Sequence, residues 1–343
     1  MPTKLLRKSL AVAIGAMLAA ASAAPLAAQD LKQITFVQPS PSAINSFPVF
    51  VAIGEGYFAD EGLDVTVEAL NGSGPVIQAV SAGQAQFGRP GPGPVLLARS
   101  RGVDVVFIYN MSVLSNFGIV VPEGSPVQKL EDLKGKVLGI GTADGAEAVF
   151  ARGVLNDLGM TEGTDYETLA VGDGGPATAA FQNNEIAAYA ASTADAAILN
   201  QRGVKVVDIM PDQFRTFFGN GYVAMRDFID ANPDVVEGFG RALVRAQIFA
   251  MDDANEEKVF AHLKAGVPQE MEDVDFARAL FHAVRAKTVP LDLSNGWGYQ
   301  NQSDWERWHN SLVETGGLEK PLDDLSAAYT NDFVEAWNEG VGQ

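Results

Sequence analysis

Three loops in this sequence carry polar groups at the points where buried strands are expected to end. They are residues 38–47, 89–93 and 141–146, and each follows a short apolar run. In open α/β sheets, ligands bind beyond the carboxyl ends of the strands, against the N-termini of the helices that follow. The unpaired N–H groups and partial positive charge there suit an anionic or strongly polar solute. The three loops are therefore the first candidates for a binding site.

The first loop offers hydroxyl and amide groups together with one aromatic ring. The candidate ligand contacts in it are Ser40, Ser42, Asn45 and Phe47. The alternative interpretation is that the serines and the asparagine cap the helix expected to begin near Phe47.

The second loop contains Arg89 and Pro90 and is stiffened by its prolines. A guanidinium group at a cleft can hold a carboxylate or a sulfonate through two parallel hydrogen bonds. The alternative is a surface arginine paired with an acidic neighbour.

The third loop places Thr142, Ala143 and Asp144 just before the N–H groups of Gly145 and Ala146. The threonine hydroxyl and these N–H groups could bind an anion. The glycine spacing is one residue too long for a dinucleotide-binding fingerprint, and no lysine completes a phosphate-binding loop. We therefore expect a solute rather than a nucleotide at this loop.

Further candidates lie outside these loops, and each has a structural alternative. They are the turns at 173–176 and 192–195, with Ser192 and Thr193, and then Asn220, Tyr222 and Trp297. At the two strand-to-helix turns, helix capping is the default. The asparagine and the tyrosine occupy an expected crossing between two lobes, and the tryptophan either walls a cleft or packs in the core.

Groups that could perform catalysis are sparse. The three histidines, His262, His282 and His309, are far apart, and none has a partner at metal-ligand spacing. The chain has no cysteine and no GxSxG nucleophile motif. We predict no catalytic residue, no metal site and no cofactor, and hence a binding protein rather than an enzyme.

The N-terminus has the three-part pattern of a secretory signal peptide over residues 1–28. Basic residues at the start precede the charge-free stretch 10–24, and small residues follow up to Ala28. The apolar stretch is shorter than the ~20 residues that a membrane span needs. We expect cleavage after Ala28, with Ala23 as the alternative, and export to the periplasm of a Gram-negative cell. The lack of cysteine excludes a lipid anchor and disulfides.

The chain is strongly acidic. Its formal net charge is −19, and loss of the three basic residues of the signal peptide would make it about −22. A field of that sign repels nucleic acid and anionic lipid and favours solubility, so no nucleic-acid partner is expected.

Strands and helices alternate through the first two thirds of the chain, and helices dominate after that. The alternation implies an α/β fold with largely parallel sheets and helices on both faces. About 315 residues would remain after cleavage, more than the ~250–300 at which one core stops growing, so two lobes are expected. The predicted lobes are residues 30–121 with 225–343, and residues 122–221, with hinges near 119–124 and 219–224.

Two phrases, GYFADEGLDV at 56–65 and AGQAQFG at 82–88, resemble the solute-binding proteins of ABC importers in the nitrate, sulfonate, taurine and thiamine-precursor branch. The resemblance implies a two-lobed periplasmic binding protein of type II, a monomer that closes on a small solute and delivers it to an inner-membrane permease with its ATPase. It also implies ligand contacts in loops 38–47 and 141–146. Many relatives carry a small or acidic residue where this chain has Arg89, so this position departs from the family pattern.

The solute stays open among sulfonate, nitrate, aromatic carboxylate and pyrimidine. Arg89 and the helix N-termini favour a small organic anion, whereas Phe47, Phe117 and Trp297 would suit a neutral heteroaromatic ring. One alternative function is a pyrimidine-precursor synthase on the same fold, but those enzymes resemble one another in a cysteine-rich motif that this chain lacks. A sensor subunit of a signalling system is the other.

Overall fold

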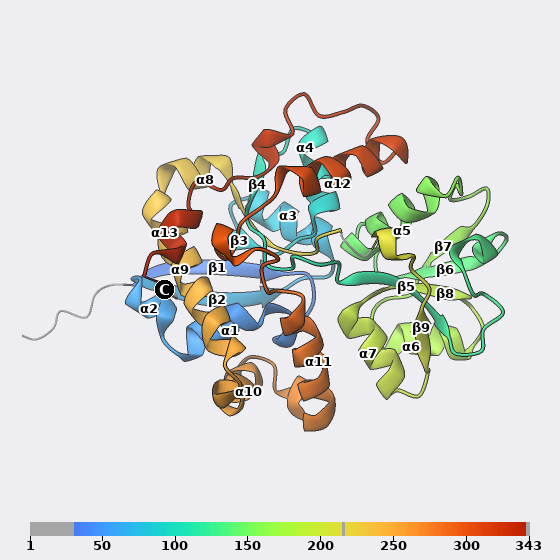
Figure 1. Cartoon of the computed structure of the whole chain (residues 1–343), viewed down its shortest axis with the longest axis horizontal. Coiled ribbons are helices and arrows are strands. Elements are labelled where there is room, and N and C mark those ends of the chain that lie inside the picture. Colours follow the sequence, from blue (N-terminus) through green and yellow to red (C-terminus); the bar gives the residue numbers. More distant parts are fainter. Residues whose placement is uncertain (1–30, 215–216, 341–343) are drawn as a thin grey trace, which may run out of the picture. The chain divides into compact units, whose positions relative to one another are not determined.

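The computed structural model describes residues 31–214 and 217–340. The predicted signal peptide, residues 1–28, lies outside the described residues. The described part contains two five-stranded sheets flanked by helices (Figure 1). This arrangement confirms the α/β class that the alternation of strand and helix patterns predicts.

The first sheet has the strand order β2-β1-β3-β10-β4. Its strands are β1 (Lys32–Gln38), β2 (Leu63–Ala69), β3 (Phe87–Gly88), β4 (Val105–Tyr109) and β10 (Tyr222–Met225). β1 pairs in parallel with β2 and β3, whereas β10 pairs antiparallel with β3 and β4. The strands β1 to β4 therefore run in one direction, and β10 runs against them.

The second sheet repeats this arrangement with the order β7-β6-β8-β5-β9. Its strands are β5 (Phe117–Pro122), β6 (Val137–Ile140), β7 (Glu167–Ala170), β8 (Ala188–Ser192) and β9 (Val206–Asp208). β6 pairs in parallel with β7 and β8, and β5 pairs antiparallel with β8 and β9. Here β5 is the strand that runs against the others.

The reversed strand in each sheet is the one that arrives from the other sheet. β5 follows β4 across the first crossing, and β10 follows β9 across the second. The entering strand begins at the carboxyl edge of its neighbours and must run inward from that edge, and antiparallel pairing needs no crossover helix. The pairing in both sheets is therefore mixed, although the other strands keep the parallel direction expected from the sequence.

Helices connect the strands and make up most of the C-terminal part. Between the strands lie α1 (Phe47–Gly54), α2 (Tyr57–Asp60), α3 (Ser73–Ser81), α4 (Pro92–Ser100), α5 (Ala146–Asp157), α6 (Gly175–Gln182) and α7 (Thr193–Gln201). After β10 come α8 (Arg226–Ala231), α9 (Pro233–Met251), α10 (Glu256–Gly266), α11 (Val274–Ala286), α12 (Gln302–Glu314) and α13 (Val334–Asn338). In the described part of the chain, no helix combines the length and the apolar character that crossing a membrane requires.

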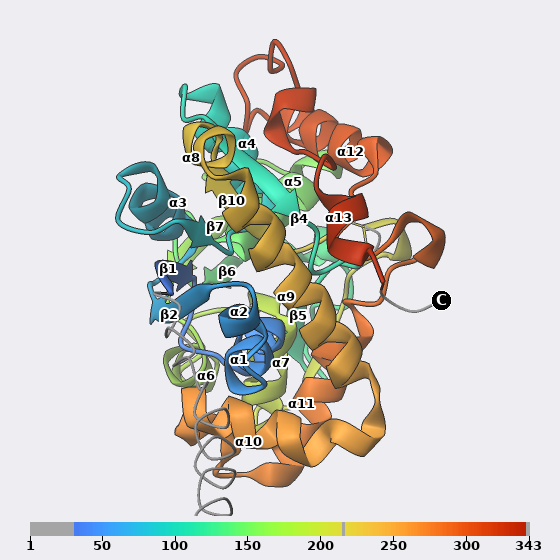
Figure 2. The same cartoon turned by 90° about the vertical axis from the view of Figure 1, so that its left-hand side faces the viewer.

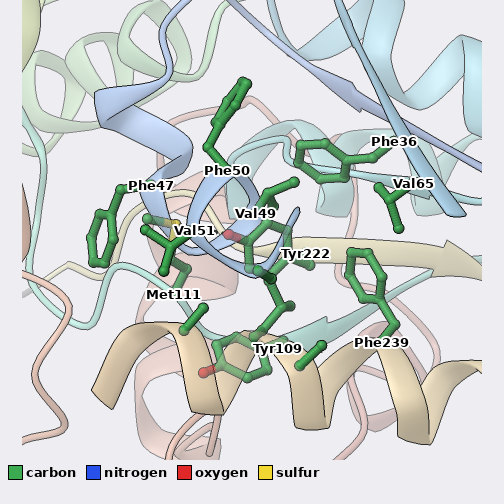
Figure 3. Close-up of a cluster of buried hydrophobic side chains, with 14 of the residues drawn as sticks. Phe36, Phe47, Val49, Phe50, Val51, Val65, Tyr109, Met111, Tyr222 and Phe239 are labelled. Carbon is green, nitrogen blue, oxygen red and sulfur yellow. Dashed lines mark hydrogen bonds between the residues drawn. The ribbon is translucent and has the colours of Figure 1, made fainter. Parts of the chain in front are cut away.

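The long helix α9 packs beside α1 and α2 and completes the core of the first sheet (Figure 2). Its Phe239 is fully buried and stacks on Phe87 with the ring centroids 3.9 Å apart. Phe36 from β1 and Tyr222 from β10 close the same cluster (Figure 3). Full burial of one such ring contributes about 1.5–3 kcal/mol, so this cluster holds the C-terminal segment onto the sheet.

The two crossing segments run side by side and leave no room for a side chain at Gly221. The Gly219 N–H donates to the Ser112 carbonyl at 2.7 Å, and the Ser112 N–H donates to the Asn220 carbonyl at 3.1 Å. A Cβ atom on Gly221 would lie 2.3 Å from the carbonyl oxygen of Tyr109. Close packing of the crossings therefore requires glycine at this position.

Gly221→Ala is accordingly expected to destabilise the protein by roughly 1–3 kcal/mol, the usual cost of forcing an extra methyl group into a packed region. Urea unfolding followed by circular dichroism measures the change. Gly153→Ala in α5 is the matched control, because a Cβ there meets only the Ser311 hydroxyl, at 3.2 Å, and alanine is favoured over glycine inside a helix. An unchanged midpoint for Gly221→Ala would show that the crossings can move apart.

Candidate ligand-binding site

A cavity of about 830 Å³ lies at the carboxyl ends of strands from both sheets. The first sheet contributes the loop after β1, the start of α3 and Arg89 after β3. The second sheet contributes residues that follow β6, β7 and β8, and a third wall comes from residues near the start of α11. Pockets of ~300–1,000 Å³ typically hold small organic ligands, so this cavity is large enough for one.

Half of the predicted contact residues line the cavity. They are Ser40, Ser42, Asn45, Arg89, Thr142, Ser192 and Asn220. Phe117, named above as a possible aromatic wall, lines it as well. The cavity therefore lies at the edge of both sheets that is indicated by the rule that ligands meet strand ends, and the ligand contacts themselves stay predictions.

Three aromatic residues predicted at the cavity belong to the core instead. Phe47 is fully buried at the start of α1, and its ring packs edge-on against Phe281 with centroids 5.4 Å apart. Tyr222 is fully buried, and its hydroxyl donates to the Met111 sulfur at 3.4 Å. Trp297 packs in the core of the first sheet, which was its structural alternative. The free energy gained by burying a large apolar ring places the ring in the core, even where the residue is next to a polar loop in the sequence.

Four other predicted residues lie near the cavity without lining it: Pro90, Ala143, Asp144 and Thr193. The Pro90 carbonyl accepts from the Gly221 N–H at 3.3 Å, and the Ala143 carbonyl accepts from Arg152 at 2.8 Å. Asp144 is exposed and lies against Gly74 in α3. Pro90, Ala143 and Asp144 therefore contact neighbouring segments and do not line this cavity, and ligand contact by them stays a prediction.

Thr193 faces a small void behind the cavity. Its hydroxyl accepts a hydrogen bond from Lys287 Nζ at 2.7 Å. Arg89 lines this void of about 10 Å³ as well as the main cavity, whereas Thr193 lines only the void.

Arg89 is a buried cation without a carboxylate partner. Its side chain is 3% exposed, and its Nε has no hydrogen-bond partner. In residues 31–214 and 217–340, no salt bridge joins it to an acidic residue, so the alternative of a surface arginine paired with an acid is wrong. Burial lowers the pKa of Arg89 to about 10, which still leaves the group charged at neutral pH. A buried charge without a partner is what an anionic ligand group can satisfy.

Asn220 holds the backbone beside this cation. Its Nδ2 donates to the Arg89 carbonyl at 3.1 Å, while its Oδ1 is buried without a partner. Asn116 Oδ1 and Thr142 Oγ1 are buried acceptors in the same condition, and both residues line the cavity. Leaving such atoms unpaired costs about 1–3 kcal/mol each, so this wall of the cavity carries polar groups that the described part of the protein does not satisfy.

The second sheet brings three carboxylates to the same cavity. Glu147 is in the first turn of α5, Asp173 follows β7, and Asp195 is in the first turn of α7. A Cβ atom on Gly141 would lie 2.0 Å from Asp173 Oδ1 and 3.0 Å from Glu147 Oε1, so these two oxygens are neighbours. We call Glu147, Asp173 and Asp195 the acidic cluster.

Burial and repulsion between carboxylates raise the pKa of two members of the acidic cluster, Glu147 and Asp195. Burial, with smaller contributions from Asp195 and Asp173, raises the pKa of Glu147 to about 8. Burial and the charge of Asp173 raise the pKa of Asp195 to about 6, although Asp195 accepts hydrogen bonds from the Ser192 hydroxyl at 2.6 Å and the Ser192 N–H at 2.9 Å. Ser192 in turn caps α7, as its structural alternative predicted.

The third wall holds the first loop in place. The Glu270 carboxylate accepts from the N–H groups of Ala43 at 2.7 Å and Ile44 at 3.0 Å. Ser42 accepts from the Asn45 N–H at 3.1 Å, so it caps this turn as well as facing the cavity. The sequence does not indicate Glu270, because the residues that it contacts, Ala43 and Ile44, lie far away along the chain. It does not indicate Glu147 either, because an acidic residue in the first turn of a helix is ordinary.

Metal ligation finds no support in this geometry. In the described ranges 31–214 and 217–340, no group of three or more histidine, aspartate or glutamate side chains is arranged to hold a metal ion. The cavity is lined by hydrogen-bonding groups and by charges of both signs.

Comparison with known proteins agrees with this architecture. Residues 43–257 match the family model described as NMT1/THI5 like. The chain belongs to this family. The NMT1/THI5-like match spans both crossings and most of the strand-end loops described above.

The relatives include binding proteins and enzymes. The riboflavin-binding protein RibY of Chloroflexus aurantiacus is 25% identical over 324 residues, 92% of this chain and 89% of RibY. The 4-amino-5-hydroxymethyl-2-methylpyrimidine phosphate synthase of Schizosaccharomyces pombe is 23% identical over 79% of this chain and 81% of the enzyme. The alkanesulfonate-binding protein SsuA of Xanthomonas axonopodis pv. citri, solved with MOPS bound, superposes with a TM-score of 0.68 at 16% identity, covering 87% of this chain and 98% of SsuA. The fold is thus the two-lobed α/β fold of periplasmic solute-binding proteins.

The raised pKa of Glu147 predicts a pH-dependent stability. Because the folded state holds this proton more tightly than the unfolded chain, the contribution is fully present below about pH 4.5 and is lost as the pH rises through about 8. Glu147→Gln cannot ionise, so we expect the variant to be more stable than the unsubstituted protein at pH 8 and the difference to shrink toward pH 5.

Thermal unfolding without ligand, at several pH values, measures this difference. Glu314→Gln is the control, because Glu314 is exposed at the end of α12, away from the cavity. A stability gain for Glu147→Gln that stays constant with pH would contradict the prediction.

Proposed function

We propose that this protein is the substrate-binding receptor of an ABC importer and that it binds a small organic solute through an anionic group held by Arg89. The observation that carries the proposal is a fully charged guanidinium, 3% exposed and unpaired with any acid among the described residues, on the wall of a cavity at the strand ends. A folded protein does not keep such a group without a compensating partner for part of its working cycle. A sulfonate or an aromatic carboxylate supplies that partner.

The size of the cavity supports an organic solute over an inorganic anion. A volume of about 830 Å³ far exceeds what a nitrate ion fills. Apolar groups from Phe117, Phe276 and Leu280 line part of the wall and can pack against a carbon skeleton.

The fold and the N-terminal sequence pattern both support a role in transport. We infer that residues 1–28 direct the chain to the periplasm and that the mature protein, as a monomer, delivers its solute to an inner-membrane permease with its ATPase. The proposed lobes are residues 30–121 with 225–343, and residues 122–221, with hinges near 119–124 and 219–224. The return crossing at 219–221 coincides with the second proposed hinge. The first crossing comes earlier than proposed, because β5 (Phe117–Pro122) already belongs to the second sheet and the chain leaves the first sheet after β4 ends at Tyr109.

An enzymatic role has less support, although pyrimidine phosphate synthases are among the relatives. The chain contains no cysteine. None of the three histidines lines the cavity, which leaves it without the usual general base. A sensor role uses the same ligand-binding site and differs only in its membrane partner.

A ligand screen followed by one substitution tests the proposal. Thermal unfolding is measured against nitrate, alkanesulfonates, taurine, aromatic carboxylates and pyrimidines. A ligand at about a thousand times its Kd stabilises the native state by ~4 kcal/mol, which shifts the midpoint by several degrees.

For the anion that binds, Arg89→Met is expected to weaken affinity by roughly 10- to 100-fold, which corresponds to a lost charged hydrogen bond of about 1.5–3 kcal/mol. Without ligand, the same variant is expected to unfold no earlier than the unsubstituted protein, because it loses a buried charge that has no partner. Arg101→Met, at an exposed arginine, is the control. Lower stability with unchanged anion affinity would mean that Arg89 is structural.

A further inference from the structure

The acidic cluster and Arg89 lie on walls that belong to different sheets. Arg89 follows β3 of the first sheet, whereas Glu147, Asp173 and Asp195 follow strands of the second. One cavity thus presents a buried cation on one side and three carboxylates on the other. We propose that the solute is bipolar, with its anionic group at Arg89 and a positively charged nitrogen group at the acidic cluster. This inference rests on the proposed function and names the class of its solute.

Helix capping explains only part of the cluster. Asp195 caps α7 together with Ser192, and acidic groups in a first helical turn gain from the helix dipole. Glu147 accepts hydrogen bonds from backbone N–H groups at the start of α5, its own and that of Thr142, so local capping accounts for its position. Capping gives no reason for Asp173 to bring an oxygen beside it at Gly141, since like charges at that spacing repel. A shared cationic ligand is a reason for this convergence.

Within residues 31–214 and 217–340, no salt bridge supplies a cation to the cluster. Arg202 lines the same cavity, but it is exposed, and none of the salt bridges among the described residues joins it to a carboxylate. The groups that do face the cluster are hydrogen-bond donors: the Tyr189 hydroxyl donates to Asp173 Oδ1 at 3.0 Å, and Ser192 donates to Asp195. The cluster is therefore positioned by neutral donors and left open toward the cavity.

Other polar groups point to a ligand independently of the acids. Asn220 is 4% exposed, lines the cavity and has a buried Oδ1 with no partner, as does the Nε of Arg89. These unpaired atoms on the first-sheet side show that the cavity is a site, and the acidic cluster defines the chemistry of its other side.

Binding of a cationic group is expected to release a proton. Near pH 7 the raised pKa of Glu147 keeps much of this carboxyl group protonated, while Asp173, Asp195, Tyr189 and Arg202 are the other titratable groups around it. A positive nitrogen favours the ionised carboxylate, so the proton leaves as the solute enters. A solute with an anionic group alone would release none from this cluster.

Matched ligand pairs test the proposal by isothermal titration calorimetry on the mature protein. The pairs are 4-(aminomethyl)benzoate against 4-methylbenzoate, and 3-aminopropanesulfonate against propanesulfonate; benzylamine represents the cation alone. For at least one pair, the zwitterion is expected to bind 10-fold or more tightly than its partner without nitrogen. Titration in buffers of different ionisation enthalpy is expected to show proton release near pH 7 for that zwitterion only.

Substitutions in the acidic cluster test whether the cluster causes the preference for the zwitterion. Glu147→Gln and Asp195→Asn are expected to abolish the preference for the zwitterion and to leave binding of the acid without nitrogen unchanged or stronger. Glu314→Gln, on the exposed end of α12, keeps the preference. Arg89→Met weakens both members of the pair, so loss of the anion site and loss of the cation site are separate results.

Three results would overturn the inference. The first is equal affinity within every pair, or no binding of any zwitterion at 10 mM. The second is a preference for the zwitterion that persists in Glu147→Gln and Asp195→Asn. The third is a stabilising shift by calcium alone that Glu147→Gln abolishes, which would make the cluster a metal site.

Discussion

The two reversed strands, β5 and β10, are the constraint on which the rest of this structure depends. Each begins where the chain arrives from the other sheet, at the carboxyl edge of its parallel neighbours. That entry point brings the carboxyl edges of both sheets, with their loops and helix N-termini, to one cavity. The crossing segments also hold the site itself, because Asn220 on the second crossing donates to the Arg89 carbonyl.

Charge in this protein matters through its location rather than its sum. A net charge of −19 describes the surface and its solubility, and it gives no reason to expect an unpaired buried arginine. Within the cavity, a low dielectric strengthens each interaction and each repulsion. The same burial that lowers the pKa of Arg89 raises the pKa of Glu147, because burial disfavours the charged form of each group. Our proposed function uses this cost, since a bound group of opposite charge would relieve it.

The sequence predicted loops that line the cavity, but not always which of their side chains line it. Ser42, Arg89 and Thr142 follow from the rule that ligands meet strand ends, and all three line the cavity. Phe47 and Tyr222 satisfy the same rule by position, yet both are fully buried in the core (Figure 3). An aromatic ring next to a polar loop can face either the core or the cavity. The spacing of apolar residues along the sequence does not tell which of the two it faces. Core packing decided the orientation, because burying the ring gains more than exposing it to a polar cavity.

What the sequence alone determined is the alternation of strands and helices, the positions of the polar loops, and the absence of cysteine. These are local properties, set by side-chain type and by spacing within a few residues. What only the tertiary structure decided is which charges face one another. Glu270 contacts Ala43 across 227 positions of sequence, and the acidic cluster joins residues from three separate strand ends. Such contacts exist only after both sheets have formed, because burial and electrostatic coupling depend on distance in space rather than along the chain.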